Sequence, residues 1–337
     1  MKSNFWRAGH TPTLLAAFLY FDLSFMVWYL LGPLQIQIAT ALSLSTQERG
    51  LVVATPILAG ALLRLVLGVM VDHIGPKRTG VIGQVIVMSS LFAAWQLGIH
   101  NFNQALLLGV MLGFAGAAFA VALPLASRWY PPEHQGTAMG IAGAGNSGTV
   151  FAALFAPMLA VALGWENVFG VVLLPLLMVF IVYCLLAKDA PGASSPKNWA
   201  AYLKVLNNRD AWLFMGFYAI TFGGFSGFAS ALPGYFHDQF AFTPQVAGWY
   251  TAACVLAGSV MRPIGGVIAD RIGGTRTLLM VYIASAILIA LAGLGLGGAH
   301  IAVLLFIAAM LCLGAGNGAV FQLVPQRFGK DLGVMTG

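Results

Sequence analysis

The chain is a succession of long apolar stretches separated by short polar segments. Crossing roughly 30 Å of hydrocarbon takes about 20 helical residues, and ten stretches are long enough. They lie near residues 12–40, 50–73, 77–98, 103–130, 136–162, 165–187, 210–236, 244–271, 275–297 and 299–327. None has the alternating ten-residue rhythm of barrel strands, so the pattern predicts an all-α integral membrane protein with ten spanning helices.

One connection is longer and more hydrophilic than the others. Residues 188–209, KDAPGASSPKNWAAYLKVLNNR, contain two prolines and a Ser-Ser pair, a composition typical of a linker. We therefore expect a six-helix bundle over residues 1–187, a cytoplasmic linker over 188–209, and a second bundle over 210–337.

Composition and charge support a membrane location. Only 8% of the 337 residues are charged, whereas a soluble domain carries roughly 25%. All Lys and Arg residues except Arg49, Arg64 and Arg262 fall on the side of the predicted membrane where the chain begins. The positive-inside rule then places the N-terminus and the linker in the cytoplasm. This orientation also explains the net charge of +6 without a nucleic-acid partner, so we expect a multi-pass protein of the cytoplasmic (inner) membrane, with the lipid bilayer as its surroundings.

The sequence repeats itself at an offset of about 200 residues. Segment 60–79, GALLRLVLGVMVDHIGPKRT, matches segment 258–277, GSVMRPIGGVIADRIGGTRT, and a weaker echo links 113–124 to 314–325. The second predicted helix thus corresponds to the eighth, and the fourth to the tenth. Two six-helix halves would have twelve spans, so we expect that the second bundle stops after its fourth helix.

The loops after the second and eighth helices share a motif. DHIGPKR (72–78) and DRIGGTR (270–276) resemble the D-x-x-G-x-[KR]-[RK] loop of the major facilitator superfamily, which implies that superfamily's two-bundle fold. An ordinary charged loop is the alternative, but the recurrence at corresponding positions argues against it. The resemblance implies a gating role, in which glycine forms the turn and the charges link helix ends, for Asp72, Gly75, Arg78, Asp270, Gly273 and Arg276.

Two arginines lie deep inside predicted helices. Arg64 is about 12 Å from the cytoplasmic helix end, and Arg262 is at the same depth in the repeat. An arginine near the bilayer centre costs at least roughly 2.5–3.5 kcal/mol, and Asp22 is the only acidic residue placed at similar depth. A bound anion would neutralise the excess charge, and guanidinium forks suit small planar oxyanions. The alternative is that the arginines donate to backbone carbonyls and helix ends.

Other polar and aromatic residues share this depth, roughly 12–18 Å by helical rise. Two asparagines lie in glycine-rich segments, AGAGNSG (142–148) and GAGNG (314–318), where backbones approach closely and an amide can donate to a ligand. Aromatic faces would fit a flat ion, although packing or lipid contact is the alternative for each ring. The candidates are Phe119, Asn146, Tyr218, Phe222 and Asn317.

Four segments carry a closer resemblance. GFAGAAFA, AGAGNSG, FYAITFGGFSGF and GAGNGAVFQLVP, together with the two arginines in the spans, resemble the nitrate/nitrite porter family of the major facilitator superfamily. The family's second glycine-rich signature belongs to the eleventh helix, which this sequence lacks. The resemblance implies a nitrate clamp made by Arg64 and Arg262, a donor in Asn146, and a pocket completed by Tyr218, Phe119 and Phe222.

The energy source is expected to be a gradient. The sequence has no G-x-x-x-x-G-K-[ST] loop for ATP, and moving one anion into a cell at an interior potential of −100 mV costs about 2.3 kcal/mol. Uptake therefore needs a co-moving cation or an exchanged anion. Asp22, about 15 Å into the first helix, is the candidate proton site; its alternative role is to pair with an arginine or a backbone donor.

The stretch FDLSFMVWYLLGPL resembles the branch assigned to proton–nitrate symport. We accordingly favour symport of nitrate with protons, with nitrite as an additional candidate substrate; nitrate/nitrite antiport and a non-transporting anion sensor are the alternatives. An enzyme is disfavoured, because the six histidines fall at helix ends or loops with no metal pair and no nucleophile–base arrangement. We expect no cofactor, no metal ion and no catalytic residue, and we expect a monomer.

Overall fold

The computed structural model describes residues 5–191, 207–295 and 297–328, and every regular element in these ranges is helical. Ten helical segments are long and apolar enough to cross a membrane, which confirms the all-α fold and its ten expected spans. They are Thr11–Ala41, Thr46–Ile74, Pro76–Leu97, Phe102–Ser127, Thr137–Leu163, Trp165–Leu186, Arg209–Phe240, Pro244–Ile272, Gly274–Gly293 and Gly298–Val324.

The chain divides into two compact units, Met1–Pro196 and Lys197–Gly337. The division falls inside the expected linker, of which 192–206 lie outside the described residues. The helices of the first unit are α1 (Phe5–Ala8), α2 (Thr11–Trp28), α3 (Leu31–Ala41), α4 (Thr46–Ile74), α5 (Pro76–Leu97), α6 (Phe102–Gly116), α7 (Phe119–Ser127), α8 (Pro132–Gly143), the 3₁₀ turn η1 (Ala144–Ser147), α9 (Gly148–Leu163) and α10 (Trp165–Leu186).

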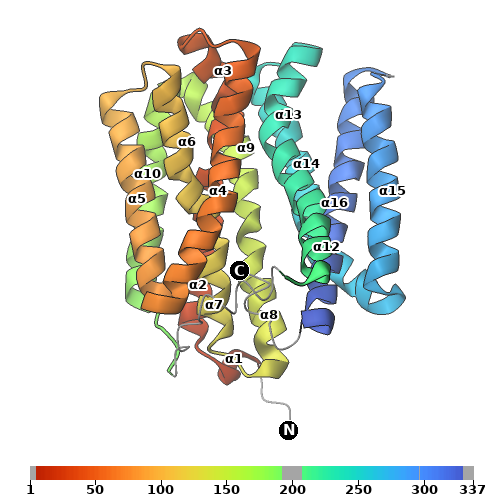
Figure 1. Ribbon diagram of the computed structural model, residues 1–337. Helices are drawn as coiled ribbons and strands as arrows, with labels where there is room; N and C mark the ends of the chain where they lie inside the picture. Colours follow the sequence, from red (N-terminus) through yellow and green to blue (C-terminus); the bar gives the residue numbers. More distant parts are fainter. Residues whose placement is uncertain (1–4, 192–206, 296, 329–337) are drawn as a thin grey trace. The chain divides into compact units, whose positions relative to one another are not determined.

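Helix α2 is the centre of the first unit. It packs against α4, α6, α7, α8, η1, α9 and α10, and the side chains of Tyr20, Phe21 and Phe25 are fully buried. Because α2 is apolar on nearly all sides, it can pack against neighbours on most of them. By contrast, α5 and α10 pack together at the edge of the unit (Figure 1).

The second unit contains α12 (Arg209–Tyr218), the π-helical turn η2 (Ala219–Gly223), α13 (Gly224–Phe240), α14 (Pro244–Ile272), α15 (Gly274–Gly293) and α16 (Gly298–Phe328). Helix α16 packs against both α14 and α15 (Figure 1). A side chain at Gly314 or Gly318 would place its Cβ 2.0 Å from the carbonyl oxygen of Gly258 or 2.1 Å from that of Arg262. Small residues thus let the α14 and α16 backbones touch, as in closely packed membrane helices.

Four of the predicted spans are interrupted, where the sequence pattern predicts continuous helices. In the first span, α2 ends at Trp28 and α3 begins at Leu31, because Pro33 has no N–H to continue the α2 hydrogen-bond ladder. In the fourth span, α6 ends at Gly116 and α7 begins at Phe119; the fifth contains η1 and the seventh contains η2. The last three interruptions lie at or next to candidate site residues.

The two motif loops turn on glycine. Gly75 has φ 87° between α4 and α5, and Gly273 has φ 94° between α14 and α15. This left-handed region is open to glycine and strained for other residues. The repeated glycine therefore gives each unit the same tight helix–helix turn.

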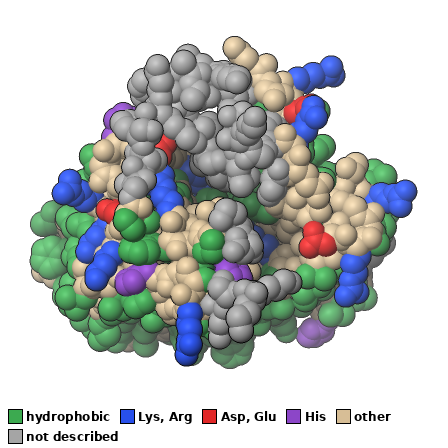
Figure 2. All heavy atoms as spheres, turned by 90° about the horizontal axis from the view of Figure 1, so that it is seen from below, with side chains coloured by type: hydrophobic (Ala, Val, Ile, Leu, Met, Phe, Trp, Pro, Cys, Tyr) green, Lys and Arg blue, Asp and Glu red, His purple; other side chains and the backbone are tan. Residues whose placement is uncertain are grey.

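The molecular surface differs between flanks and ends. Large apolar side chains such as Leu62, Leu97 and Leu185 are about 70% exposed, which is the expected state of residues that contact lipid. Figure 2 views the end at which α4 meets α5 and shows Lys and Arg side chains on this face, with hydrophobic side chains around its edge. The charged residues between the spans thus lie at a helix end, as a membrane-spanning bundle requires.

Candidate anion-binding site

In the first unit, Arg64 lies over an aromatic ring. Its Cζ is 5.1 Å from the centroid of Phe119, a buried residue that opens α7. A guanidinium at this distance is attracted by the negative face of the ring. The planar group is thereby held in a fixed orientation near the interruption of the fourth span.

The same interruption supplies a backbone acceptor. The backbone amide of Ala120 donates to the carbonyl of Ala117 at 3.0 Å. It therefore does not donate to the Gly116 carbonyl, as it would in a continuous α-helix. Arg64 Nη2 donates to the Gly116 carbonyl at 3.4 Å, which is long for a charged hydrogen bond. The alternative role of Arg64, donation to a backbone carbonyl, is therefore observed in the first unit.

Trp28 fixes the backbone beside Arg64. Its Nε1 donates to the carbonyl of Pro56 at 2.6 Å, and its ring fills the space next to two glycines. A Cβ at Gly116 would lie 2.2 Å from this ring, and one at Gly60 would lie 2.8 Å from it. Both positions must therefore stay glycine for the indole to pack between α4 and α6.

Asn146 is buried in the η1 turn. Glycines lower helix propensity, and the AGNSG stretch has them on both sides of the asparagine–serine pair. Thr149 Oγ1 donates to the Asn146 carbonyl at 2.8 Å. Phe21 connects the turn with the arginine cluster, because a Cβ at Gly145 would lie 2.7 Å from its ring and its centroid is 5.7 Å from that of Phe119.

Asp22 lies against the same turn. Its carboxylate accepts a hydrogen bond from Ser147 Oγ at 2.7 Å and another from the backbone amide of Gly148, and the residue is only 6% exposed. Within the described ranges it makes no ion pair. Besides a proton site, the alternative roles of Asp22 were to pair with an arginine or to accept from a backbone donor. The arginine pair is not observed in these ranges, whereas the backbone donor, Gly148, is present.

The second unit repeats the arginine–aromatic arrangement. Arg262 Cζ is 5.1 Å from the centroid of Phe321. The Phe321 ring meets Tyr218 edge-on at 5.5 Å, and Tyr218 stacks on Phe222 at 5.0 Å with an interplanar angle of 2°. The structure therefore brings Arg262, Tyr218 and Phe222 together through Phe321, which the sequence analysis missed. The sequence did contain a signal for Phe321: in each half, a phenylalanine lies in the second span after the span that carries the arginine.

A π-helical turn sets the positions of these rings. Tyr218 ends α12 and Phe222 lies within η2. The carbonyl of Phe217 accepts hydrogen bonds from Thr221 Oγ1 at 3.1 Å and from the Tyr282 hydroxyl at 3.0 Å. These donors compensate for the backbone bond that a π turn displaces, and such turns occur frequently at functional sites.

Tyr218 and Asn317, two candidate residues of the second unit, each have a buried side-chain oxygen without a partner in the described part of the chain. Both chain neighbours of Asn317 are closely packed glycines. A Cβ at Gly316 would lie 2.5 Å from the Thr221 side chain, and one at Gly318 would lie 2.1 Å from the Arg262 carbonyl oxygen. Buried polar groups are normally satisfied. The Tyr218 hydroxyl can donate to an anion or to water, whereas the Asn317 amide oxygen only accepts and is suited to water or another donor.

The motif loops differ between the units. Asp72 forms an ion pair with Arg128 Nη2 at 3.0 Å, while its counterpart Asp270 is exposed. In the second unit Arg327, which follows the tenth span, pairs instead with Asp210 at the start of α12. The arginines at the ends of the two motifs, Arg78 and Arg276, are exposed.

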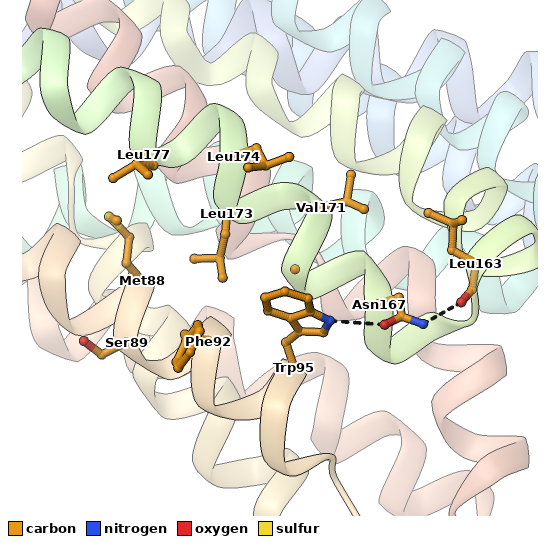
Figure 3. Close-up of a pocket in the computed structure, with 11 residues that line it drawn as sticks. Met88, Ser89, Phe92, Trp95, Leu163, Asn167, Val171, Leu173, Leu174 and Leu177 are labelled. Carbon is orange, nitrogen blue, oxygen red and sulfur yellow. Dashed lines mark hydrogen bonds between the residues drawn. The ribbon is translucent and has the colours of Figure 1, made fainter.

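A separate pocket lies between α5 and α10. It has a volume of about 740 Å³ and is lined by apolar side chains, with Trp95 Nε1 donating to Asn167 Oδ1 at 3.1 Å (Figure 3). Its lining contains no charged residue. Because the pocket opens among exposed apolar side chains on the flank of the unit, it is a surface groove and no place for an anion.

The fold and these clusters define a class of protein: a helical membrane transporter whose halves each place an arginine against aromatic rings inside a span. A sequence model described as Major Facilitator Superfamily matches residues 16–337, and the chain belongs to this superfamily, whose members are transporters rather than enzymes.

Its relatives narrow the class to nitrate/nitrite transporters. The chain is 33% identical over 322 residues to a "Nitrite extrusion protein" of Bacillus subtilis (strain 168), covering 93% of this chain and 78% of that protein. It is 32% identical over 341 residues to a "Probable nitrate/nitrite transporter NarK2" of Mycobacterium tuberculosis (98% and 84%). The fold is similar to a partially occluded, inward-open structure of the xylose transporter XylE from E. coli, with a TM-score of 0.74 at 12% identity over 97% of this chain and 89% of that one.

Proposed function

We propose that this protein carries nitrate, and also nitrite, across the cytoplasmic membrane in symport with protons, as a monomer whose N-terminus and linker lie in the cytoplasm. The observation that carries the proposal is the repeated arrangement of an in-span guanidinium over a phenylalanine ring, Arg64 over Phe119 and Arg262 over Phe321. Relatives named for nitrate and nitrite transport support the choice of anion.

The chemistry of the two clusters fits a small planar oxyanion. A guanidinium offers parallel N–H donors that match two oxygens of one anion, and the ring face beneath it excludes water. Asn146 in the first unit, together with Asn317 and the Tyr218 hydroxyl in the second, adds donors at the same depth in the spans. Asp22 accepts hydrogen bonds from Ser147 and Gly148 and makes no ion pair with an arginine in the described part of the chain.

The coupling follows from the membrane potential. Entry of one nitrate against an interior potential of −100 mV costs about 2.3 kcal/mol, and two co-transported protons would reverse the sign of the moved charge. Asp22 is the buried carboxylate that can carry such a proton. Exchange of nitrate for nitrite is the second candidate, favoured by the name of the B. subtilis relative.

Reconstitution of the purified protein in proteoliposomes tests these alternatives. We expect labelled nitrate to accumulate when an inward proton gradient is imposed on vesicles that contain no nitrite. Accumulation only with nitrite inside would replace symport by exchange. Nitrate binding without flux in either condition would contradict transport and indicate a sensor.

A further inference from the structure

The η1 turn holds two neighbouring residues with different tasks. Asn146 is an anion ligand in the proposed function, and Ser147, the next residue, bonds to Asp22 through its side chain. The turn is four residues long and lies between α8 and α9. A short 3₁₀ segment inside a helix is a typical hinge, so a change at one of these residues is transmitted to the other over a single peptide bond.

Ser147 has two acceptors within reach of one proton. Its Oγ is 2.7 Å from Asp22 Oδ1 and 3.0 Å from the carbonyl oxygen of Ala144. A hydroxyl carries one hydrogen and can donate to only one of them at a time. An ionised carboxylate is the stronger acceptor, so the hydroxyl donates to Asp22 when that residue is charged.

Protonation of Asp22 reverses this hydrogen bond. The carboxylic acid is now itself a donor and donates to Ser147 Oγ, whose own hydrogen rotates to the Ala144 carbonyl at the start of the turn. The proton enters Asp22 from the outer aqueous phase and later leaves the same carboxyl for the cytoplasm, and serine keeps its hydrogen throughout. Only the Asp22 O–H bond forms and breaks.

Close backbone packing prevents the η1 turn from shifting along α2 when the hydrogen bonds of Ser147 change. A Cβ at Gly148 would lie 1.8 Å from the Asp22 carbonyl oxygen, and one at Gly145 would lie 2.8 Å from the Asp22 amide nitrogen. Helix α2 and the turn are thus in backbone contact on both sides of Asn146 and Ser147. A change in the hydrogen bonds of Ser147 must then appear as a change in the orientation of the turn that carries Asn146.

Other charged groups do not compete for Asp22. In the described ranges it makes no hydrogen bond or ion pair with the ionisable side chains of the helices packed against α2; η1, α6, α7 and α9 contribute none. These side chains are Glu48, Arg49, Arg64, Asp72 and His73 from α4, His134 from α8, and Glu166, Tyr183 and Cys184 from α10. Ser147 and Gly148 are therefore the direct contacts through which its protonation state can be read.

We propose that Ser147 is the positioning residue that couples the proton on Asp22 to the anion held by Asn146. The inference rests on the proposed function of nitrate–proton symport. It assigns Ser147 no contact with nitrate, and it makes the serine hydroxyl, rather than the shape of the side chain, the required feature. Threonine keeps that hydroxyl, whereas alanine removes it.

The test is the pH dependence of nitrate binding and uptake in Ser147→Ala and Ser147→Thr. Ser90→Ala is the control, because the Ser90 hydroxyl donates to the backbone carbonyl of Ile86 in its own helix. Nitrate dissociation constants are measured by calorimetry between about pH 5.5 and pH 8.5, where linkage to one proton changes Kd by up to about tenfold per pH unit. Uptake into proteoliposomes is measured with and without a proton gradient.

For Ser147→Ala we expect a nitrate Kd within about threefold of the unmodified protein at acidic pH, a flat pH dependence, and no stimulation of uptake by the proton gradient. Ser147→Thr and Ser90→Ala should retain both responses. The inference is overturned if Ser147→Ala keeps the normal pH dependence or if Ser147→Thr is as flat as the alanine variant. Failure of the unmodified protein to bind nitrate would instead overturn the proposed function.

Discussion

Replacement of Arg64 by lysine tests the guanidinium geometry without changing the charge. In the structure the guanidinium is stacked over Phe119 with Cζ 5.1 Å from the ring centroid, and Nη2 donates to the Gly116 carbonyl. A lysine ammonium offers neither a flat face to the ring nor a pair of parallel donors to the anion.

The expected loss can be estimated from these contacts. One charged hydrogen bond to the anion contributes about 1.5–3 kcal/mol, and the stacking contributes about 0.5–1 kcal/mol more for the planar group. At 1.4 kcal/mol per tenfold, the nitrate Kd of Arg64→Lys should rise between roughly 20-fold and several hundredfold.

Calorimetric titration of the purified protein with nitrate measures the change directly. Arg7→Lys is the matched control, because Arg7 is an exposed arginine on α1, and its Kd should equal that of the unmodified protein. A Kd for Arg64→Lys within twofold of the control would remove Arg64 from the anion site and refute the argument from guanidinium geometry.

Three further changes have defined outcomes. Asp22→Asn should abolish uptake driven by a proton gradient while leaving nitrate Kd within about threefold of the value that the unmodified protein has at acidic pH; undiminished coupling in vesicles would exclude the aspartate as proton carrier. Gly148→Ala should lower the midpoint of thermal unfolding, because its Cβ would lie 1.8 Å from the Asp22 carbonyl oxygen and overpacking costs about 1–3 kcal/mol. Gly140→Ala, with open space around it, should not lower it, and equal midpoints would contradict the packing. Phe321→Leu should weaken nitrate binding about 2- to 30-fold by removing the ring beside Arg262, and an unchanged Kd would show that the ring has no part in the site.

The spans were predictable because bilayer thickness fixes the length of an apolar stretch. The ten predicted ranges differ from the helices by a few residues at most ends, and the turns at Gly75 and Gly273 coincide with the repeated motif. The interruptions were not predictable in the same way. The π turn at Ala219–Gly223 depends on a donor from another helix, the Tyr282 hydroxyl on the Phe217 carbonyl, and no local pattern shows that contact.

The candidate site was predicted in composition but not in detail. Depth along a helix placed Arg64, Phe119, Tyr218 and Phe222 in one layer, yet depth says nothing about the direction in which a side chain points. Phe321 was missed for this reason, since one turn of α16 carries residues of equal depth on different faces. The link between Asp22 and Ser147 joins residues 125 positions apart, which requires the tertiary packing of α2 on η1.

The most direct test of the account is whether nitrate binds at the in-span arginines. Solid-state NMR on protein with ¹³C-labelled arginine side chains and bound ¹⁵N-nitrate detects dephasing of each guanidinium carbon by the anion nitrogen. We predict dephasing from two arginines, of which one component disappears in Arg64→Lys and the other in Arg262→Lys. If both components persist in Arg64→Lys or in Arg262→Lys, or if dephasing is absent from the unmodified protein saturated with nitrate, the assignment of these arginines to anion binding is contradicted.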